Sequence, residues 1–333
     1  MKVLITGATG FVGGALAREL IKDGKYEIRA LVRKDSNIST IQRLDGLEVT
    51  FGDLRDKESL EKALRGCRGL YHAAAHNALW ARDSRIFYDV NVRGTQNILD
   101  AALEEGVEKV VYTSSIRALG IPQKGTLANE ETEFNCWHIK DHYMKSKYVA
   151  EQLCLKMAEK GLPVVIVNPT GPVGPGDIRP TPTGKSIVDF LNGKLPGYLD
   201  GGFNLVDVED VAKGHILAFH KGRIGESYIL GNRNISMKEF FLLLERISKV
   251  PAPKMSIPYP LALALAAACA LELSSKITRK PPPLTVARVQ IISKYIYFDC
   301  SKAIRELGLP QTPIELSLEK AVRWFRENGY MHI

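Results

Sequence analysis

Tyr143 and Lys147 are four residues apart in the segment YMKSK. On a helix, residues at this spacing lie on the same face, so the phenol and the ammonium would enter one site. A tyrosine hydroxyl keeps its proton up to about pH 10, and a nearby cation lowers that pKa. Such a pair can exchange a proton with the oxygen of an alcohol or a carbonyl compound. The spacing also arises by chance, so its meaning depends on the elements that position it.

Hydroxyl side chains precede this pair in the run YTSS at positions 112–115. The run ends the apolar segment 107–113, which we predict to be a strand. A serine just past the end of a strand can hold the reacting oxygen by a hydrogen bond. On position alone, Ser114 and Ser115 both satisfy this requirement.

A glycine-rich turn lies at the start of the sequence. The apolar run from Met1 to Thr6 predicts a buried strand, and the segment GATGFVG follows it at positions 7–13. In dinucleotide-binding proteins the first glycine allows a tight turn, the second admits the pyrophosphate, and the third lets helix and strand pack closely. The phosphates lie at the N-terminus of the helix. The spacing G-x-x-G-x-x-G therefore indicates a dinucleotide site.

Strand-like and helix-like segments alternate through the first half of the chain. The further strands that we predict are Ile28 to Arg33, Leu47 to Phe51, Gly69 to His72, Val107 to Thr113 and Val164 to Asn168. The predicted helices are Phe11 to Asp23, Lys57 to Arg65, Arg93 to Glu105 and Asp141 to Lys160. This order predicts an α/β fold with a doubly wound parallel sheet, whose ligands bind at the carboxyl ends of the strands. Gly7, Arg33, Ala73, Ser115 and Pro169 should therefore meet at one edge.

The pattern changes after Asn168, where turns rich in proline and glycine run to Gly184. We expect residues 1–169 to form the nucleotide-binding domain and residues 170–333 a smaller substrate-binding lobe. The segment Phe203 to Lys213 should return to the main sheet.

The composition is that of a globular enzyme, with 45% apolar and 25% charged residues and a formal net charge of +8. Lysines and arginines are scattered among acids, so we expect no nucleic-acid partner. Five cysteines form no CxxC pair, as expected for reduced thiols. The apolar segment from Leu261 to Leu271 is too short to cross a bilayer, and we expect a buried helix there. We therefore predict a cytoplasmic protein without an integral membrane segment.

Taken together, the motifs of this chain resemble a known family. They are TGATGFVG at 6–13, Gly52-Asp53-Leu54, HAAA at 72–75, NVRGT at 91–95, YTSS at 112–115, YMKSK at 143–147 and the turns after 168. Their order is similar to that of the extended short-chain dehydrogenase/reductases, or NAD-dependent epimerase/dehydratase family, including dihydroflavonol reductases. PTPTG at 180–184 resembles hopanoid-associated sugar epimerases, and NGKLPGY at 192–198 resembles farnesol dehydrogenases. The resemblance implies a Rossmann fold.

The resemblance also implies a role for each motif. Tyr143 is the acid and base, Lys147 holds the nicotinamide ribose and lowers the Tyr143 pKa, and Ser115 steadies the substrate oxygen. Asp53 and Leu54 contact the adenine. The cofactor-binding residues that we expect are Gly7, Thr9, Gly10, Phe11, Val12, Gly13, Arg33, Lys34, Asp53, Leu54, Ala73, Ala74, Ala75, Thr113, Tyr143, Lys147, Pro169 and Val173.

The end of the second predicted strand decides the choice of cofactor. An acid there binds the ribose hydroxyls of NAD, whereas an arginine accommodates the 2′-phosphate of NADP. The chain has Arg33 and Lys34 at this point, with Asp35 only afterwards. We therefore expect NADP in preference to NAD, with stacking of Arg33 on adenine as the alternative.

Two histidine pairs, His72 with His76 and His138 with His142, have a spacing that can bind zinc on a helix. Neither pair has an evident third ligand, and we predict no metal site. The substrate-side contacts that we expect are Trp80, His142, Arg179 and Tyr198.

Three functions fit these residues. The first is a dehydrogenase or reductase, which exchanges its cofactor at each turnover and acts on a small organic carbonyl or alcohol. The second is a nucleotide-sugar epimerase or dehydratase that retains NAD, with Arg179, Arg223 and Arg233 as candidates to bind a sugar diphosphate. The third is a non-catalytic sensor of NAD(P). The predicted helices 93–105 and 141–160 could form a homodimer interface.

Overall fold

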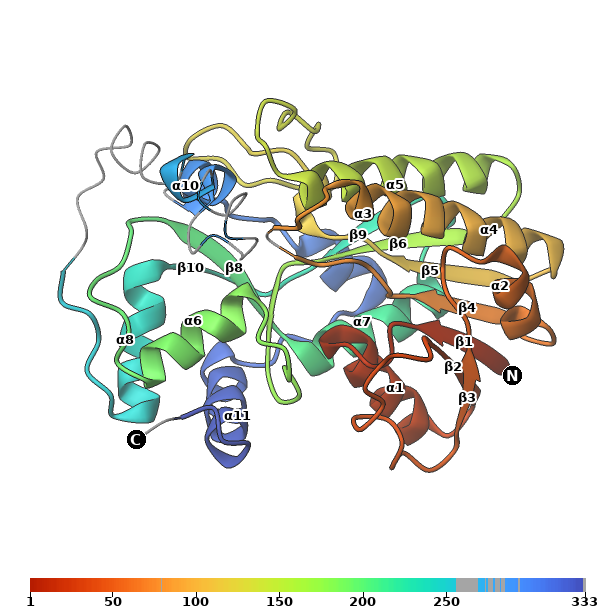
Figure 1. Ribbon diagram of the computed structural model, residues 1–333, viewed down its shortest axis with the longest axis horizontal. Coiled ribbons are helices and arrows are strands. Elements are labelled where there is room, and N and C mark those ends of the chain that lie inside the picture. The colour runs from red at the N-terminus through yellow and green to blue at the C-terminus, as the bar shows by residue number, and fades with distance from the viewer. Residues whose placement is uncertain are drawn as a thin grey trace.

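Seven parallel strands form the main sheet of the computed structural model (Figure 1). Their order is β3-β2-β1-β4-β5-β6-β9, the arrangement of a doubly wound sheet. The strands are β1 (Lys2–Thr6), β2 (Glu27–Val32), β3 (Leu47–Phe51), β4 (Gly69–His72), β5 (Lys109–Thr113), β6 (Val164–Pro169) and β9 (Ser227–Leu230). The structure describes residues 1–78, 80–255, 269–272, 285–292 and 294–331, with the single residues 274, 278 and 282. The predicted fold class is confirmed.

Helices cover both faces of this sheet. On one face α1 (Phe11–Asp23) packs against α7 (Val208–Lys221). On the other lie α2 (Lys57–Leu64), α4 (Gly94–Glu104) and α5 (His142–Glu159). A short helix α3 (Arg85–Tyr88) and a π turn (Asp89–Arg93) lead into α4. Each face has its own buried apolar cluster, because strands buried on both sides need a core on both sides.

A smaller lobe contains a three-stranded sheet in the order β10-β8-β7. Its strands are β7 (Gly171–Val173), β8 (Gly202–Asp207) and β10 (Arg233–Ser236). Its helices are α6 (Pro182–Leu191), α8 (Met237–Ser248), α10 (Val286–Ile292) and α11 (Ile314–Glu327). The prediction that residues 203–213 return to the main sheet is wrong for the strand: β8 pairs with β7 and β10, and β9 is the strand that joins the main sheet beside β6.

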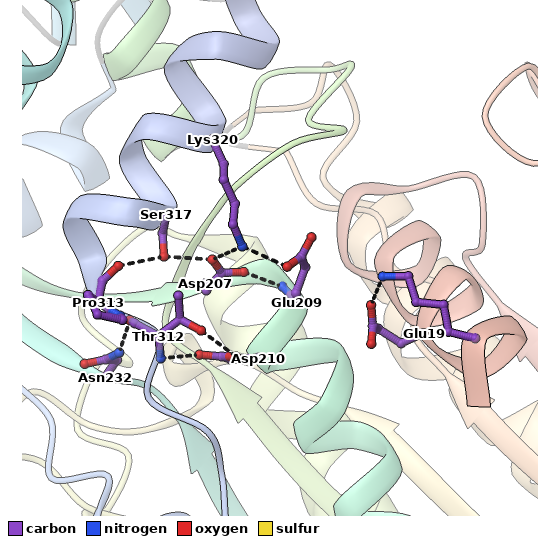
Figure 2. A network of polar contacts seen from close by, with 10 residues as sticks. Glu19, Asp207, Glu209, Asp210, Asn232, Thr312, Pro313, Ser317 and Lys320 are labelled. Carbon is purple, nitrogen blue, oxygen red and sulfur yellow. Dashed lines mark hydrogen bonds and ion pairs between the residues drawn. The ribbon is translucent and has the colours of Figure 1, made fainter.

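A polar network fastens α11 to the start of α7 (Figure 2). The fully buried carboxylate of Asp207 accepts hydrogen bonds from Ser317 (2.8 Å) and Lys320 (3.2 Å). Lys320 also donates to Glu209 at 2.8 Å. Asp210 accepts from the backbone and the hydroxyl of Thr312 at 2.7 and 3.0 Å. Since α7 packs on the main sheet and α11 belongs to the small lobe, these contacts tie the two parts together.

The predicted apolar helix from Leu261 falls mostly outside the described residues, which resume at position 269. Among the helices that are described, none combines the length and apolar character needed to cross a membrane.

Candidate active site

A cavity of about 860 Å³ runs along the carboxyl edge of the main sheet and continues under the small lobe. The glycine turn, the ends of the strands and the N-terminal part of α5 form one end of its wall, and segments of the small lobe form the other. Ser115, Tyr143 and Lys147 all line it. The structure therefore brings the predicted proton-transfer residues and the glycine turn into one space.

The glycine turn has the geometry of a dinucleotide cradle. Gly7 has a φ of +78°, and a Cβ there would lie 2.7 Å from the Ala74 nitrogen. A Cβ on Gly13 would lie 2.2 Å from the Gly7 carbonyl oxygen. Gly10 is the N-cap residue of α1 and has no side chain to occupy the free N–H groups of the first turn. That turn carries no acidic residue. These N–H groups are therefore available to an anion such as a pyrophosphate.

Supporting contacts hold the loop that faces this turn. The buried His72 hydrogen-bonds through Nδ1 to the Thr6 hydroxyl (2.8 Å) and through Nε2 to Thr95 (3.1 Å). The Ala74 N–H donates to the same Thr6 oxygen at 3.0 Å. Burial lowers the pKa of His72 to about 3, so the ring is neutral. His72 uses both ring nitrogens to position the loop at 73–75.

At the far end of the cradle, Arg33 is an exposed cation with a loose ion-pair contact. Arg33 lines the cavity, and its Nε lies 3.5 Å from Asp35, with both side chains more than half exposed. Asp53 is held by Arg55 at 2.6 Å, which lowers the pKa of the Asp53 carboxyl to about 2. Lys34 is exposed and lies outside the cavity wall. Of the predicted basic pair, Arg33 alone faces the site.

Ser115 and Tyr143 are adjacent in the structure. Ser115 has an extended backbone and begins the short 3₁₀ helix Ile116–Ala118. Tyr143 is the second residue of α5, whose N-terminus is capped by the Asp141 carboxylate. Burial raises the pKa of Tyr143 to about 12, against the opposing effects of a hydrogen bond with Ser115 and the charge of Arg117. Tyr143 therefore carries its proton at neutral pH.

Lys147 lies one turn further along α5 and is fully enclosed. Its Nζ donates to the Tyr112 hydroxyl and to the Thr113 carbonyl oxygen, both at 2.7 Å. It also lies 4.3 Å from the centre of the Tyr112 ring. Burial lowers the pKa of Lys147 to about 8. This differs from our expectation that Lys147 lowers the Tyr143 pKa: in the structure the cation that does so is Arg117.

The small lobe contributes a mainly apolar wall to the cavity. Its apolar members include Ile178, Phe203, Met237, Phe240, Ala287, Ile291, Ile296 and Phe298. Arg179 lines the cavity as predicted. No sequence pattern linked the residues between 285 and 298 to the site, because they follow α5 by more than a hundred residues and lack a motif. Sequence reasoning also missed Arg117. Its position two residues after Ser115 is the signal that could have placed it at the site.

Four predicted contacts lie elsewhere. Val173 is buried in the core of the small lobe, and Tyr198 packs on Phe241 beside that core. His142 is exposed and hydrogen-bonds to Tyr88 at 3.3 Å. Trp80 is half-buried outside the cavity wall. His142 points away from the site because its neighbour Tyr143 points in, and adjacent helical residues face different directions.

Apart from Lys34 and Val173, every residue that we expected to bind the cofactor lines the cavity. Asn91 instead supports it from behind, since its side chain accepts from the His76 N–H (2.6 Å) and donates to the Ser146 hydroxyl (2.9 Å).

Comparison with known proteins gives consistent matches. A sequence profile of the NAD dependent epimerase/dehydratase family matches residues 3–231. A putative dihydroflavonol 4-reductase from Synechocystis sp. is 43% identical over 331 residues, 98% of this chain and 95% of the relative. Sterol demethylase protein B from Methylococcus capsulatus is 35% identical, over 99% of both chains. The crystal structure of gox2253 is similar over 99% of both chains, with a TM-score of 0.87 and 40% identity.

Proposed function

The chain belongs to the NAD dependent epimerase/dehydratase family and is an NAD(P)-dependent oxidoreductase, and we propose that it interconverts a carbonyl group and an alcohol on an apolar small molecule. One observation carries this proposal. Ser115, Tyr143 and Lys147 line the cavity that also receives the glycine turn and the apolar wall of the small lobe. A proton donor, a dinucleotide cradle and an apolar substrate space are thereby continuous.

Each polar residue has a distinct task in this proposal. The bound nicotinamide supplies or accepts the hydride. Tyr143, protonated because burial raises its pKa to about 12, donates its proton to the carbonyl oxygen during reduction. The Ser115 hydroxyl donates a hydrogen bond to the same oxygen. Lys147 has one N–H beyond the two that Tyr112 and Thr113 engage, and it holds the nicotinamide ribose.

The charges around the cavity favour this activity over nucleotide-sugar epimerisation. Among the three arginines considered for a sugar diphosphate, Arg179 lines the cavity. Arg223 instead pairs with Glu306, and Arg233 pairs with Glu239 and Glu315, all outside the cavity wall. The wall of the small lobe is mainly apolar, and among the described residues its cations are Arg179 and Lys294. Such a wall suits an uncharged body, such as a terpenoid or an aromatic compound, better than a diphosphate. The relative named as a reductase supports the same reading.

The proposed cofactor is NADP(H). Arg33 faces the adenosine end of the cradle with only a loose, exposed contact to Asp35, so its guanidinium is available for a 2′-phosphate. Asp53, the nearest acid on the cavity wall, is already engaged by Arg55.

We also infer a homodimer in the cytoplasm. The proposed dimer interface is the surface of α4, α5 and the turn before α4. This surface contains a groove lined by Val92, Gln96, Tyr148 and Leu153 among others. The cysteines among the described residues are free thiols, as expected for a protein in a reducing compartment.

Cofactor analysis of the purified protein tests the activity. We expect protein free of bound NAD that consumes NADPH in proportion to the terpenoid or aromatic ketone reduced. NAD retained through purification, together with conversion of a UDP-sugar without net cofactor consumption, would overturn the proposal in favour of an epimerase.

A further inference from the structure

Glu151 is a buried acid directly behind the catalytic residues. It lies on α5 one turn after Lys147 and two turns after Tyr143, and it is 6% exposed. It lies outside the cavity wall, so it cannot touch substrate or cofactor. A carboxyl group enclosed in this way is costly unless its charge is balanced and its oxygens accept hydrogen bonds.

Burial disfavours the charged form of Glu151, but several of its neighbours favour that form. The Asn168 amide donates to Glu151 Oε2 at 2.8 Å. Burial raises the pKa of Glu151, and the Ser114 hydroxyl, the Asn168 amide and the Lys147 ammonium oppose that rise. An N–H donor aimed at the oxygen and a cation one turn away both favour the charged form.

Asn168 links Glu151 to the backbone of Ser115. Its amide also donates to the Ser115 carbonyl oxygen at 3.2 Å. Because both neighbours of the amide are acceptors, its orientation is fixed. Asn168 is fully buried at the end of β6, so it cannot move independently of the sheet. The carboxylate on α5 thereby fixes the backbone from which the Ser115 hydroxyl projects.

Glu151 also acts on Lys147, which lies four residues before it on the same face of α5, and its charge raises the pKa of that ammonium. The Lys147 ammonium also interacts electrostatically with other titratable groups among the described residues. These are His72 on β4, Tyr112 on β5 and Cys154 on α5. Burial lowers the pKa of His72 to about 3 and raises the pKa values of Tyr112 and Cys154 well above their usual range. These three groups are neutral near pH 8, so Glu151 is the acid among the described neighbours of Lys147 that can supply a negative charge there.

We propose that Glu151 is a positioning residue whose carboxylate keeps the Lys147 ammonium charged in its buried site and, through Asn168, fixes the backbone of Ser115. This inference rests on the role proposed above for Lys147. The charge matters because a neutral lysine at this position donates a weaker hydrogen bond to the ribose.

The test measures NADPH binding by fluorescence as a function of pH, and it needs no substrate. In the unaltered protein, affinity should fall as pH rises through about 8, where Lys147 loses its proton. In Glu151→Gln the midpoint should move to lower pH by about one unit. At pH 8 the variant should therefore bind NADPH about fivefold more weakly, with little difference at pH 6. If the protein prefers NADH, the same titration is made with NADH.

Two further variants keep the test decisive. Glu151→Asp retains the charge and should keep the midpoint near that of the unaltered protein. Glu159→Gln removes an exposed acid from the same helix and should change nothing. If Glu151→Gln does not fold, Glu151→Met removes the charge without leaving an unpaired amide.

The outcomes separate the two proposals. A midpoint that stays in place in Glu151→Gln or Glu151→Met would overturn the role of Glu151. Affinity without any dependence on pH in the unaltered protein would instead contradict the role of Lys147.

Discussion

Replacing Arg33 with glutamine should change the choice of dinucleotide. A charge-assisted hydrogen bond between a guanidinium and a phosphate contributes about 1.5–3 kcal/mol. Against this, the contact of Arg33 with Asp35 is 3.5 Å long, and the side chains are 55% and 75% exposed, so losing it costs at most about 1 kcal/mol. The net contribution is about 0.5–2 kcal/mol. Arg33→Gln should therefore weaken NADPH binding by about 2- to 30-fold.

NADH lacks the 2′-phosphate, so its affinity should change little, and the ratio of the two dissociation constants is the quantity to measure. Fluorescence titration of each reduced dinucleotide gives both constants. Arg55→Gln is the matched control, since Arg55 lines the same cavity but is bound to Asp53 through two hydrogen bonds of 2.9 and 2.6 Å. An unchanged ratio in Arg33→Gln would refute the reasoning and favour stacking on adenine.

Three further predictions concern other parts of the site. Tyr143→Phe should lower kcat by about 10²- to 10⁴-fold, the usual contribution of a general acid, while the dissociation constant of NADPH stays nearly the same; substantial remaining turnover in steady-state assays would contradict its role. Because burial lowers the pKa of Lys147 to about 8, kcat/KM for ketone reduction should be constant below that pH and fall above it as the ammonium loses its proton; a rate that rises instead would reverse the assignment. Gly13→Ala would place a Cβ 2.2 Å from the Gly7 carbonyl oxygen and should weaken cofactor binding by at least about tenfold, as measured by calorimetry.

Local sequence signals located the nucleotide-binding half closely. The predicted helix 11–23 and the predicted strands 47–51 and 69–72 have the bounds found in the structure. For a central strand such as β4, which is buried on both faces, a continuous apolar run is a clear signal. The edge at which Gly7 and Ser115 meet also followed from the sequence, since parallel strands place all their carboxyl ends together.

Pairing between distant segments was harder to predict. The β8 sequence GFNLVD is buried and is followed directly by a helix, as are the strands of the main sheet. Either sheet could bury such a strand, and its partner depends on contacts that the segment itself does not specify. The contact of Lys147 with Tyr112 was missed for the same reason, because it joins residues 35 positions apart on different elements.

The division between the two halves of the cavity has a consequence for specificity. The predicted proton-transfer residues lie just after β5 (Ser115) and on α5 (Tyr143 and Lys147). Behind them, Asn168 donates to the Ser115 carbonyl oxygen and to Glu151. The apolar wall comes from the small lobe, including segments after position 285. Substitutions in that wall can therefore change which molecule is bound without disturbing the groups that move the proton. On the roles proposed above, the family profile corresponds to the chemistry at the sheet edge, and the small lobe determines which oxygen is presented to Tyr143.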